Sequence, residues 1–170
     1  VRYADDCNIY VRSQAAGERV LASVTEFLWK RLRLRVNREK SAAAPVWERK
    51  FLGHRIFSGT GLGIAPQSLM RARERIRRIT RRNRGISLDR MIRELNVFLN
   101  GWVTYYRHTS GRRVFVELDR WLRRRLRCYV WKQWKKPRKR ARELIKAGVG
   151  RWAAWGMAYD GPGPWRTAGC

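Results

Sequence analysis

The sequence predicts an α+β fold in which a small β-containing segment is followed by a longer helical segment. Two observations support this class: β-prone runs alternate with turn residues up to about Ala65, and apolar residues recur at helical spacing from Pro66 onward. A third is that 44% of the 170 residues are hydrophobic, which is enough to form a core. We place the boundary between the two segments near residues 63–66.

The first segment begins with a predicted β-hairpin. Residues 1–3 and 8–11 are β-prone and flank an acidic turn at residues 4–7. A helix is expected at about residues 15–33, because apolar residues recur there with helical periodicity. This apolar stripe consists of Val20, Val24, Phe27, Leu28 and Leu32.

Short strands are expected after this helix, at residues 34–37, 41–45 and 50–57. Residues 58–61, with the sequence Ser-Gly-Thr-Gly, have the composition of a turn. Residues 62–65 form a last extended piece, so the β-prone part of the chain ends where the helical pattern begins.

The second segment contains four predicted helices. The first begins at Pro66 and ends before Gly85, and the second follows a predicted N-cap at Ser87 and extends to Tyr106. The third and fourth are expected at about residues 114–134 and 137–146. The stripes expected in the core are Leu69, Ala72, Ile76 and Ile79 in the first helix, Leu88, Met91, Ile92, Leu95, Leu99, Trp102, Val103 and Tyr106 in the second, and Phe115, Leu118, Leu122, Leu126 and Tyr129 in the third. The remaining residues, 151–170, are rich in Trp, Gly and Pro without a clear period, so they are left unassigned.

The net charge of +27 indicates a polyanionic partner, because it far exceeds what solubility requires. Residues 71–170 contain 28 basic and 7 acidic side chains, whereas residues 1–70 contain 12 and 6, so we expect nucleic acid to lie mainly against the second segment. No apolar run approaches the ~20 residues that span a bilayer, and no signal-peptide pattern is present. We therefore expect a cytoplasmic ribonucleoprotein without membrane contact. The three cysteines have neither disulfide nor zinc spacing.

Asp5 and Asp6 are the first candidates for chemistry. Neighbouring residues on a regular strand point to opposite faces, so two adjacent carboxylates approach one cation only at a turn, which is where the pattern places them. Carboxylates suit Mg²⁺, and two such ions about 3.5 to 4 Å apart activate a hydroxyl and stabilise a leaving pyrophosphate in nucleotidyl transfer. The alternative is that the two aspartates only favour the turn.

Three motifs in the first segment resemble those of reverse transcriptases. Tyr3-Ala4-Asp5-Asp6 resembles the central catalytic motif, Asn37-x-x-Lys40-Ser41 resembles the next motif, and Phe51-Leu52-Gly53 resembles the primer grip. The resemblance implies that two Mg²⁺ ions bind at Asp5 and Asp6 and that Lys40 lies near the triphosphate as a catalytic residue. It implies primer and template contacts at Tyr3, Phe51, Leu52 and Gly53.

The second segment resembles the maturase region of group II intron proteins. The resemblance rests on Leu95-Asn96-x-Phe98-Leu99-Asn100-Gly101-Trp102-Val103-x-Tyr105-Tyr106-Arg107, on Leu118-Asp119-x-Trp121 with residues 123–127, and on Trp131-Lys132-x-Trp134-Lys135. In that family this region contacts the intron RNA and helps it to fold for splicing. The predicted RNA-binding residues are Arg77, Arg78, Arg81, Asn100, Tyr105, Arg107, Arg123, Arg124, Arg127, Lys132 and Lys135.

Together the two resemblances predict the order of the parts. Residues 1–65 are expected to be the C-terminal part of a polymerase palm, residues 66–86 the start of a thumb, residues 87–150 the maturase region and residues 151–170 an unassigned tail. The implied function is an RNA-directed DNA polymerase and splicing maturase of a mobile element. Its partners would be group II intron RNA, a DNA target or primer and deoxynucleoside triphosphates. The resemblance implies a bacterial protein, and the sequence leaves the oligomeric state open.

The enzyme hypothesis predicts an incomplete active site in this chain. Reverse transcriptases use a further metal-binding aspartate from an earlier strand, which would lie before Val1, so we expect a fragment that incorporates no nucleotides by itself. Two alternatives stay open: a non-catalytic RNA-binding and splicing module, or another bacterial reverse transcriptase class. The stretch Gly101-Trp102-Val103-x-Tyr105-Tyr106 argues against the second alternative.

Overall fold

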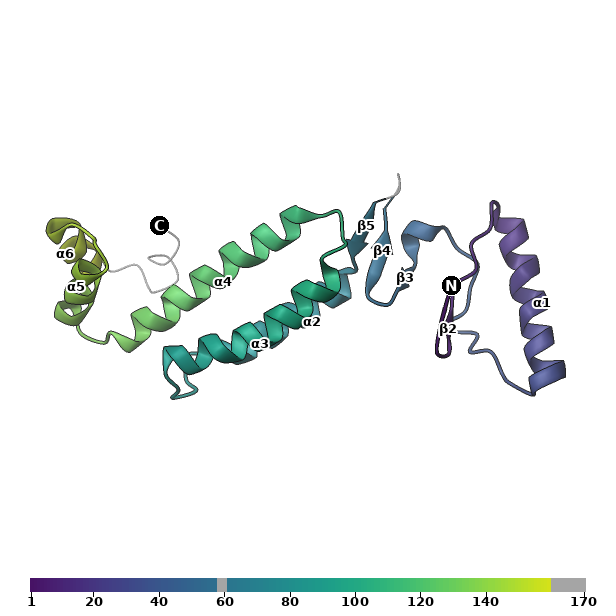
Figure 1. The fold of residues 1–170 in the computed structure, drawn as a ribbon, viewed down its shortest axis with the longest axis horizontal. Helices are drawn as coiled ribbons and strands as arrows, with labels where there is room; N and C mark the ends of the chain where they lie inside the picture. The colour runs from purple at the N-terminus through teal and green to yellow at the C-terminus, as the bar shows by residue number, and fades with distance from the viewer. Residues whose placement is uncertain (58–60, 160–170) are drawn as a thin grey trace. The chain divides into compact units, whose positions relative to one another are not determined.

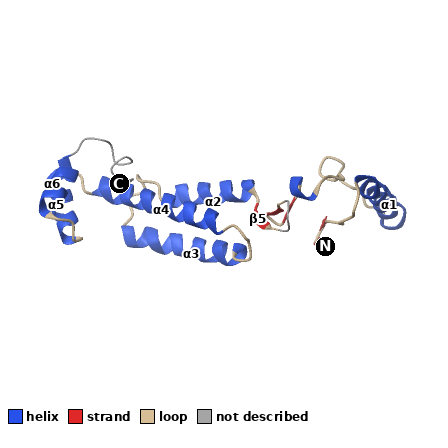
Figure 2. Cartoon of the chain, turned by 90° about the horizontal axis from the view of Figure 1, so that it is seen from above, coloured by secondary structure: helices blue, strands red, loops and turns tan. Residues whose placement is uncertain are grey.

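The structure, a computed structural model, describes residues 1–57 and 61–159 and confirms the α+β class (Figure 1). Among the described residues, all strands precede α2, and one helix, α1, lies between the two sets of strands (Figure 2). The chain divides into two compact units, Val1–Ser68 and Leu69–Cys170. Among the described residues, no helix is long and apolar enough to cross a membrane.

The first unit begins with the hairpin that the sequence predicts, formed by β1 (Arg2–Tyr3) and β2 (Asp6–Cys7). Its tight turn places Ala4 in the left-handed region, with φ at 51°. The second strand is two residues long and lies within the predicted turn at residues 4–7, so the expectation of a strand at residues 8–11 is wrong. Only Asn8 continues the pairing, because its backbone N–H donates to the carbonyl of Val1 at 2.8 Å and the chain then leaves the ladder.

Helix α1 (Gln14–Leu32) agrees with the prediction to within one residue at each end. The Ser13 side chain accepts a hydrogen bond from the backbone of Ala16 and caps the start, and Arg33 ends the helix in the left-handed region. None of the residues of α1 is buried, and Phe27 is 57% exposed, so the predicted stripe is only partly covered. The strands of this unit contain two or three residues each, which is too little surface to bury a helix of 19 residues.

A three-stranded antiparallel sheet with the order β3-β4-β5 follows a short 3₁₀ turn, η1 (Val46–Glu48). The predicted strand at 50–57 is a hairpin of β3 (Lys50–Phe51) and β4 (His54–Ile56). The strand breaks because Leu52 and Gly53 both have positive φ, as two-residue hairpin turns require. The last strand, β5 (Leu62–Ile64), confirms the expected extended piece. The strands expected at 34–37 and 41–45 are wrong, because no strand of the described chain pairs with them.

Three long helices, α2 (Pro66–Ile79), α3 (Leu88–Tyr106) and α4 (Arg112–Gln133), supply the main core. Helices α2 and α4 run in the same direction and α3 runs opposite to them (Figures 1 and 2). The core contains residues from all three helices: Ile76, Ile79, Met91, Leu95, Leu118, Leu122 and Tyr129. Each of these belongs to a stripe that the sequence predicts, so the faces of these helices follow from periodicity.

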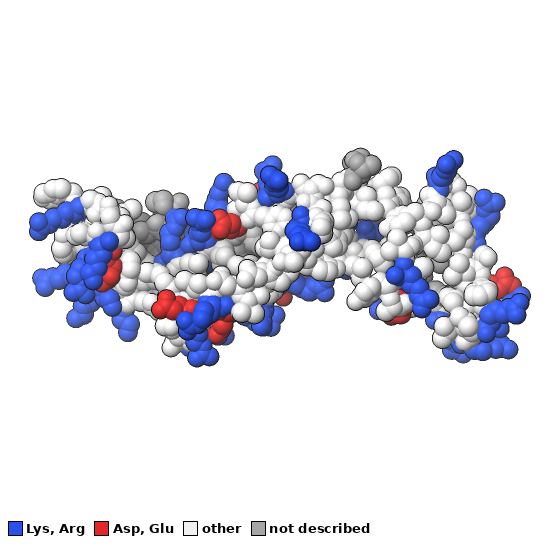
Figure 3. Space-filling model, in the orientation of Figure 1, with Lys and Arg blue, Asp and Glu red and all other residues white. Residues whose placement is uncertain are grey.

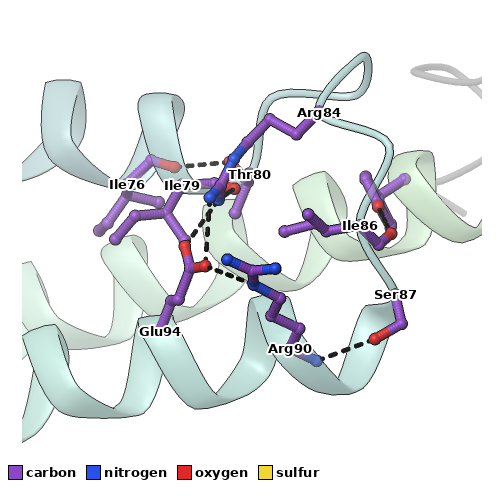
Figure 4. Close-up of polar contacts among 9 residues, drawn as sticks. Ile76, Ile79, Thr80, Arg84, Ile86, Ser87, Arg90 and Glu94 are labelled. Atoms are coloured by element: carbon purple, nitrogen blue, oxygen red, sulfur yellow. Dashed lines mark hydrogen bonds and ion pairs between the residues drawn. The ribbon is translucent and has the colours of Figure 1, made fainter.

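Helix α2 ends at Ile79, five residues before the predicted end. Two side chains take over the last carbonyls of the helix: Thr80 Oγ1 donates to the Ile76 carbonyl at 2.7 Å, and Arg84 donates to the Ile79 carbonyl at 2.7 Å (Figure 4). The chain then turns into α3, whose predicted N-cap is confirmed, since Ser87 Oγ accepts from the backbone N–H of Arg90.

Two shorter helices complete the second unit. Helix α5 (Pro137–Lys146) confirms the prediction, whereas α6 (Arg151–Tyr159) lies in the tail that the sequence left unassigned. Residues 160–170 of that tail lie outside the described residues. The two helices pack through small side chains, Ala141 on α5 and Ala154 and Ala158 on α6, all at most 1% exposed. The alanines on α6 are four residues apart, which is the spacing of one helix face. The high content of Trp and Gly in this segment obscures that pattern in the sequence.

The Arg84–Glu94 ion pair fixes the connection between α2 and α3, and it gives the unit a testable pH dependence. Two nitrogens of Arg84 contact the two Glu94 oxygens at 2.7 and 3.1 Å (Figure 4). The hydrogen bond from Arg84 lowers the pKa of Glu94 below its ordinary value of 4.5. Because this pKa is lower in the folded state, the pair stabilises the fold above about pH 4.5, and the contribution is lost as the pH falls through the folded-state value.

We therefore expect Glu94→Gln to lower the melting temperature at pH 7, and the difference from the original chain to disappear at acid pH. Circular dichroism melts at several pH values measure this. The matched control is Glu117→Gln, because Glu117 pairs with Arg113, which is 90% exposed, and such a pair contributes little. An equal effect of both variants at pH 7 contradicts the role of Arg84.

Candidate nucleic-acid interface

A polar contact joins α2 to α4 at a position where apolar packing is expected. Arg125 Nε donates to Thr80 Oγ1 at 2.6 Å, and a terminal nitrogen of Arg125 donates to the Arg77 carbonyl at 3.4 Å. Thr80 is buried, at 1% exposed, and its hydroxyl also donates to Ile76. The guanidinium of Arg125 therefore lies between the helices as a hydrogen-bond donor to polar groups at the C-terminal end of α2.

Trp121 holds two cations of this region on its ring. The guanidinium carbon of Arg77 lies 5.7 Å from the ring centroid and that of Arg125 lies 5.2 Å from it. Each guanidinium is attracted by the ring's electrons, which offsets part of the repulsion between the two cations. Trp121 thus orients Arg77 and Arg125 beside one another.

Four arginines, Arg77, Arg82, Arg124 and Arg125, surround this point, and we call them the arginine cluster. Two of them, Arg82 and Arg125, line a cavity of about 190 Å³ together with Thr80 and Cys128. Burial, followed by the charge of Arg77, lowers the pKa of Arg125. Burial raises the pKa of the Cys128 thiol, and the nearby charges of Arg82, Arg124 and Arg125 oppose that rise.

Three of the four arginines in the cluster have no carboxylate partner among the described residues. Within residues 1–57 and 61–159, Arg77, Arg82 and Arg125 form no ion pair with a carboxylate. The acidic side chains of α4 pair elsewhere, since Asp119 contacts Arg123 at 2.8 Å. Lys and Arg side chains outnumber acidic ones over the visible face of the helical unit (Figure 3). An electropositive cavity of this kind is suited to phosphate groups.

The predicted RNA-binding residues of α2 and α4 are placed in three ways. Arg77 and Arg124 belong to the arginine cluster. Arg123 is exposed but bound to Asp119, so its charge is partly compensated within the protein. The remaining basic residues predicted on or after these helices are exposed, and they are Arg78, Arg81, Arg127, Lys132 and Lys135.

The predicted residues of α3 lie at the other end of the three-helix core. Asn100, Tyr105 and Arg107 are exposed near the end of α3, where the Trp102 ring packs edge-on against Phe115 of α4. Tyr105 is 50% exposed and its ring stands nearly perpendicular to that of Tyr106. These three residues are therefore accessible, and they form a surface separate from the arginine cluster along α3.

The predicted metal ligands are both exposed, Asp5 in the turn between β1 and β2 and Asp6 at the first position of β2. The Arg2 guanidinium donates to the carbonyl of Ala4 at 3.0 Å and supports this turn. Carboxylate oxygens at an exposed turn are suitable donors for Mg²⁺. The described residues contain no group of three or more His, Cys, Asp or Glu side chains that could hold a metal ion.

The other predicted catalytic residue, Lys40, is positioned by a local turn. Asn37 Oδ1 accepts hydrogen bonds from the backbone of Glu39 at 3.1 Å and of Lys40 at 3.2 Å. Asn37 therefore has a structural reason to precede the lysine by three residues, and the Lys40 side chain is exposed.

The predicted primer-binding residues belong to the two hairpins. Tyr3 is 63% exposed on β1 and pairs with Asp6 in the hairpin register. Phe51 is half-buried on β3, and Leu52 and Gly53 form the turn that follows it. The structure records where these residues lie, and their contacts with a primer stay a prediction.

Sequence reasoning did not select Thr80, Arg82, Trp121 or Arg125 as site residues. A signal was available for Arg125, because it follows Leu122 by three residues and precedes Tyr129 by four, which puts a cation on the core-facing stripe of α4. Thr80 similarly follows Ile76 by four residues and comes directly after α2. Polar residues at two core positions of neighbouring helices indicate a contact between them.

The comparison with known families identifies the region that contains this cluster. Residues 69–148 match the family described as "Group II intron, maturase-specific domain", which extends from the first turn of α2 to the end of α5. No curated protein matches the chain. The match contains every residue of the arginine cluster together with the stretch from Gly101 to Tyr106. Residues 69–148 therefore form a group II intron maturase-specific domain, and the predicted kinship of this region with group II intron proteins is confirmed.

Proposed function

We propose that this chain binds group II intron RNA through the helical unit and assists the folding of that RNA for splicing. Intron RNA is the partner that a maturase-specific domain implies. The observation that carries the proposal is the arginine cluster, in which Arg77, Arg82 and Arg125 have no acidic partner within the described residues. Phosphate groups are the ligands that such a cluster binds.

The cluster favours structured RNA over a loose polyanion. Thr80 and Trp121 fix Arg125 on one side, so its guanidinium does not need to be ordered when RNA binds. A cation that is held before binding loses less rotamer entropy than a mobile surface lysine. The arrangement therefore selects for phosphates at a defined spacing, which a folded RNA provides.

The test compares the cognate intron RNA with an unrelated structured RNA of the same length in filter-binding assays. We expect tighter binding of the intron RNA, and about a tenfold loss of affinity for it in Arg82→Gln, because a charge-assisted contact with a phosphate is removed. Arg113→Gln is the matched control, since Arg113 already pairs with Glu117 at 3.0 Å. Equal binding of both RNAs, or equal losses in the two variants, contradicts the proposal.

We further propose that the first unit derives from an RNA-directed DNA polymerase. Support comes from the exposed carboxylates of Asp5 and Asp6 in the β1–β2 hairpin and from Lys40, which the Asn37 turn presents to solvent. When bound, Mg²⁺ would supply activation of the primer hydroxyl and charge neutralisation at the departing pyrophosphate, and Asp5 and Asp6 would hold it. The partners in that reaction would be a DNA primer and deoxynucleoside triphosphates, with Phe51 beside the primer.

Primer extension in Mg²⁺ separates this polymerase from a non-catalytic splicing module. We expect no nucleotide incorporation by the 170-residue chain alone, because two carboxylates are too few ligands for a pair of Mg²⁺ ions. RNA binding by the same preparation serves as the positive control. Incorporation that is abolished in Asp5→Ala contradicts this expectation and assigns a complete active site to the chain.

A further inference from the structure

A second electropositive cavity lies between α5 and α6, and part of it falls outside the matched maturase-specific domain. Its volume is about 460 Å³, and it is lined by Lys136, Arg138, Lys139, Arg142 and Trp155. We call it the α5–α6 pocket. Trp155 belongs to α6, beyond the last matched residue at 148. Lys and Arg side chains gather at this end of the unit (Figure 3).

The small side chains between the two helices explain why the pocket forms. Ala141 and Ala154 are fully buried, so α5 and α6 approach each other closely. Arg138 and Arg142 lie one helical turn apart on α5, and Ala141 lies between them in sequence. Trp155 follows Ala154 directly, and it therefore flanks the packed face and borders the same cavity as the two arginines.

The aromatic side of the pocket is ordered by a second ring. Trp155 and Tyr159 stack with centroids 5.8 Å apart and an interplanar angle of 20°. A ring that is fixed in this way offers a flat surface at low entropic cost. Bases of unpaired nucleotides stack on such rings, and stacking tolerates any base.

The cationic side of the pocket is only partly neutralised. Arg142 contacts Glu143 at 3.7 Å, and Lys146 shares that carboxylate at 3.8 Å. Lys136, Arg138 and Lys139 form no ion pair within residues 1–57 and 61–159. Three uncompensated cations beside one aromatic ring match the phosphate and base of a nucleotide whose base is free to stack.

We propose that the α5–α6 pocket binds an unpaired nucleotide, with its phosphates on Arg138 and Lys139 and its base on Trp155. The proposal deepens the RNA binding proposed above by adding a single-strand site to a domain whose arginine cluster faces folded RNA. A paired base cannot stack on Trp155, so the pocket discriminates single strands from duplexes. RNA and DNA single strands both offer a phosphate and an unpaired base, so both fit the pocket equally well.

Fluorescence anisotropy with the full chain tests this, using labelled oligouridylate of about ten nucleotides, its deoxyuridylate counterpart and a perfect RNA duplex. We expect Trp155→Leu to weaken binding of both single strands about tenfold and to leave duplex binding within about twofold. A ribose contact would make the loss larger for oligouridylate. If Trp155→Leu weakens binding to phosphatidylserine vesicles but leaves binding of both single strands unchanged, the pocket belongs to a membrane surface and the proposal is overturned.

Two further variants keep the outcome decisive. Trp152→Leu is the matched control, because Trp152 lies on the same helix, is 92% exposed and does not line the pocket. The double variant Arg138→Gln and Lys139→Gln changes only exposed side chains, so it preserves the fold even if Trp155→Leu loosens α6. It should lower the salt dependence of single-strand binding by about 0.7 for each phosphate that these two side chains neutralise.

Equal losses in Trp152→Leu and Trp155→Leu, or an unchanged affinity of the double variant for single strands, overturn the inference. The proposed function fails separately, through equal binding of intron and unrelated RNA. If the chain still prefers the intron RNA and Trp155→Leu does not change single-strand affinity, only the proposal for the α5–α6 pocket is contradicted.

Discussion

The affinity of the chain for intron RNA should fall about 10³- to 10⁵-fold when the salt concentration rises from about 50 to 200 mM. The physical reason is that each phosphate neutralised by Lys or Arg releases condensed counterions, and their release becomes less favourable as bulk salt increases. A fall of this size corresponds to about 6 to 10 phosphate contacts. The arginine cluster and the α5–α6 pocket each supply four cationic side chains, and their total of eight lies within that range.

Filter binding across a salt series measures the slope of the logarithm of affinity against the logarithm of salt concentration. The variant Arg82→Gln should reduce this slope by about 0.9, whereas Arg113→Gln should leave it unchanged. Salt screens the interaction between exposed charges that lie farther apart than a Debye length of about 8 to 10 Å. Basic residues that are distant from the RNA therefore contribute little to the slope. A nearly flat slope would mean that the helical unit does not bind RNA through phosphate contacts.

Replacing Ile76 with Ala should destabilise the helical unit by about 2 to 5 kcal/mol. Ile76 is fully buried and belongs to the core that α2, α3 and α4 share. Removing its methyl groups loses their transfer free energy and leaves a cavity that rigid helices fill only in part. Because domains of this size are stable by about 5 to 15 kcal/mol, such a loss is a large fraction of the total.

Urea denaturation followed by far-ultraviolet circular dichroism measures this change in the free energy of unfolding. Ile92→Ala is the matched control, because the same atoms are removed from a residue of α3 that is 37% exposed. We expect Ile92→Ala to cost less than about 1 kcal/mol. Equal losses at the two positions would mean that the helices do not share the core described for them.

Helix positions in this chain were predictable because they depend on local sequence. The spacing of Met91 and Leu95 defines one face of α3, and Ser87 caps its start through a contact within the same turn. The resemblance to group II intron proteins was also readable, since its motifs are contiguous, and the match at residues 69–148 bears it out. The short strands were less predictable, because a strand forms only where another strand pairs with it.

The candidate site was predictable only in part. Arg77 and Arg124 were selected from the charge pattern, but Arg82 and Arg125 were not, although all four surround the same point. Arg123 looked equivalent to its neighbours in sequence, yet its pairing with Asp119 reduces its availability to RNA. Charge patterns locate a basic helix, but they do not state which of its cations are compensated.

By itself, the sequence determined the order of a β-containing segment and a helical segment, the apolar faces of the long helices and the kinship with group II intron maturases. These features follow from periodicity, caps and contiguous motifs, which act over a few residues. Only the tertiary structure decided that Arg125 joins Thr80 and Trp121, and that Trp155 meets the cations of α5. Such sites depend on which faces of separate helices meet, and packing between distant segments fixes that choice.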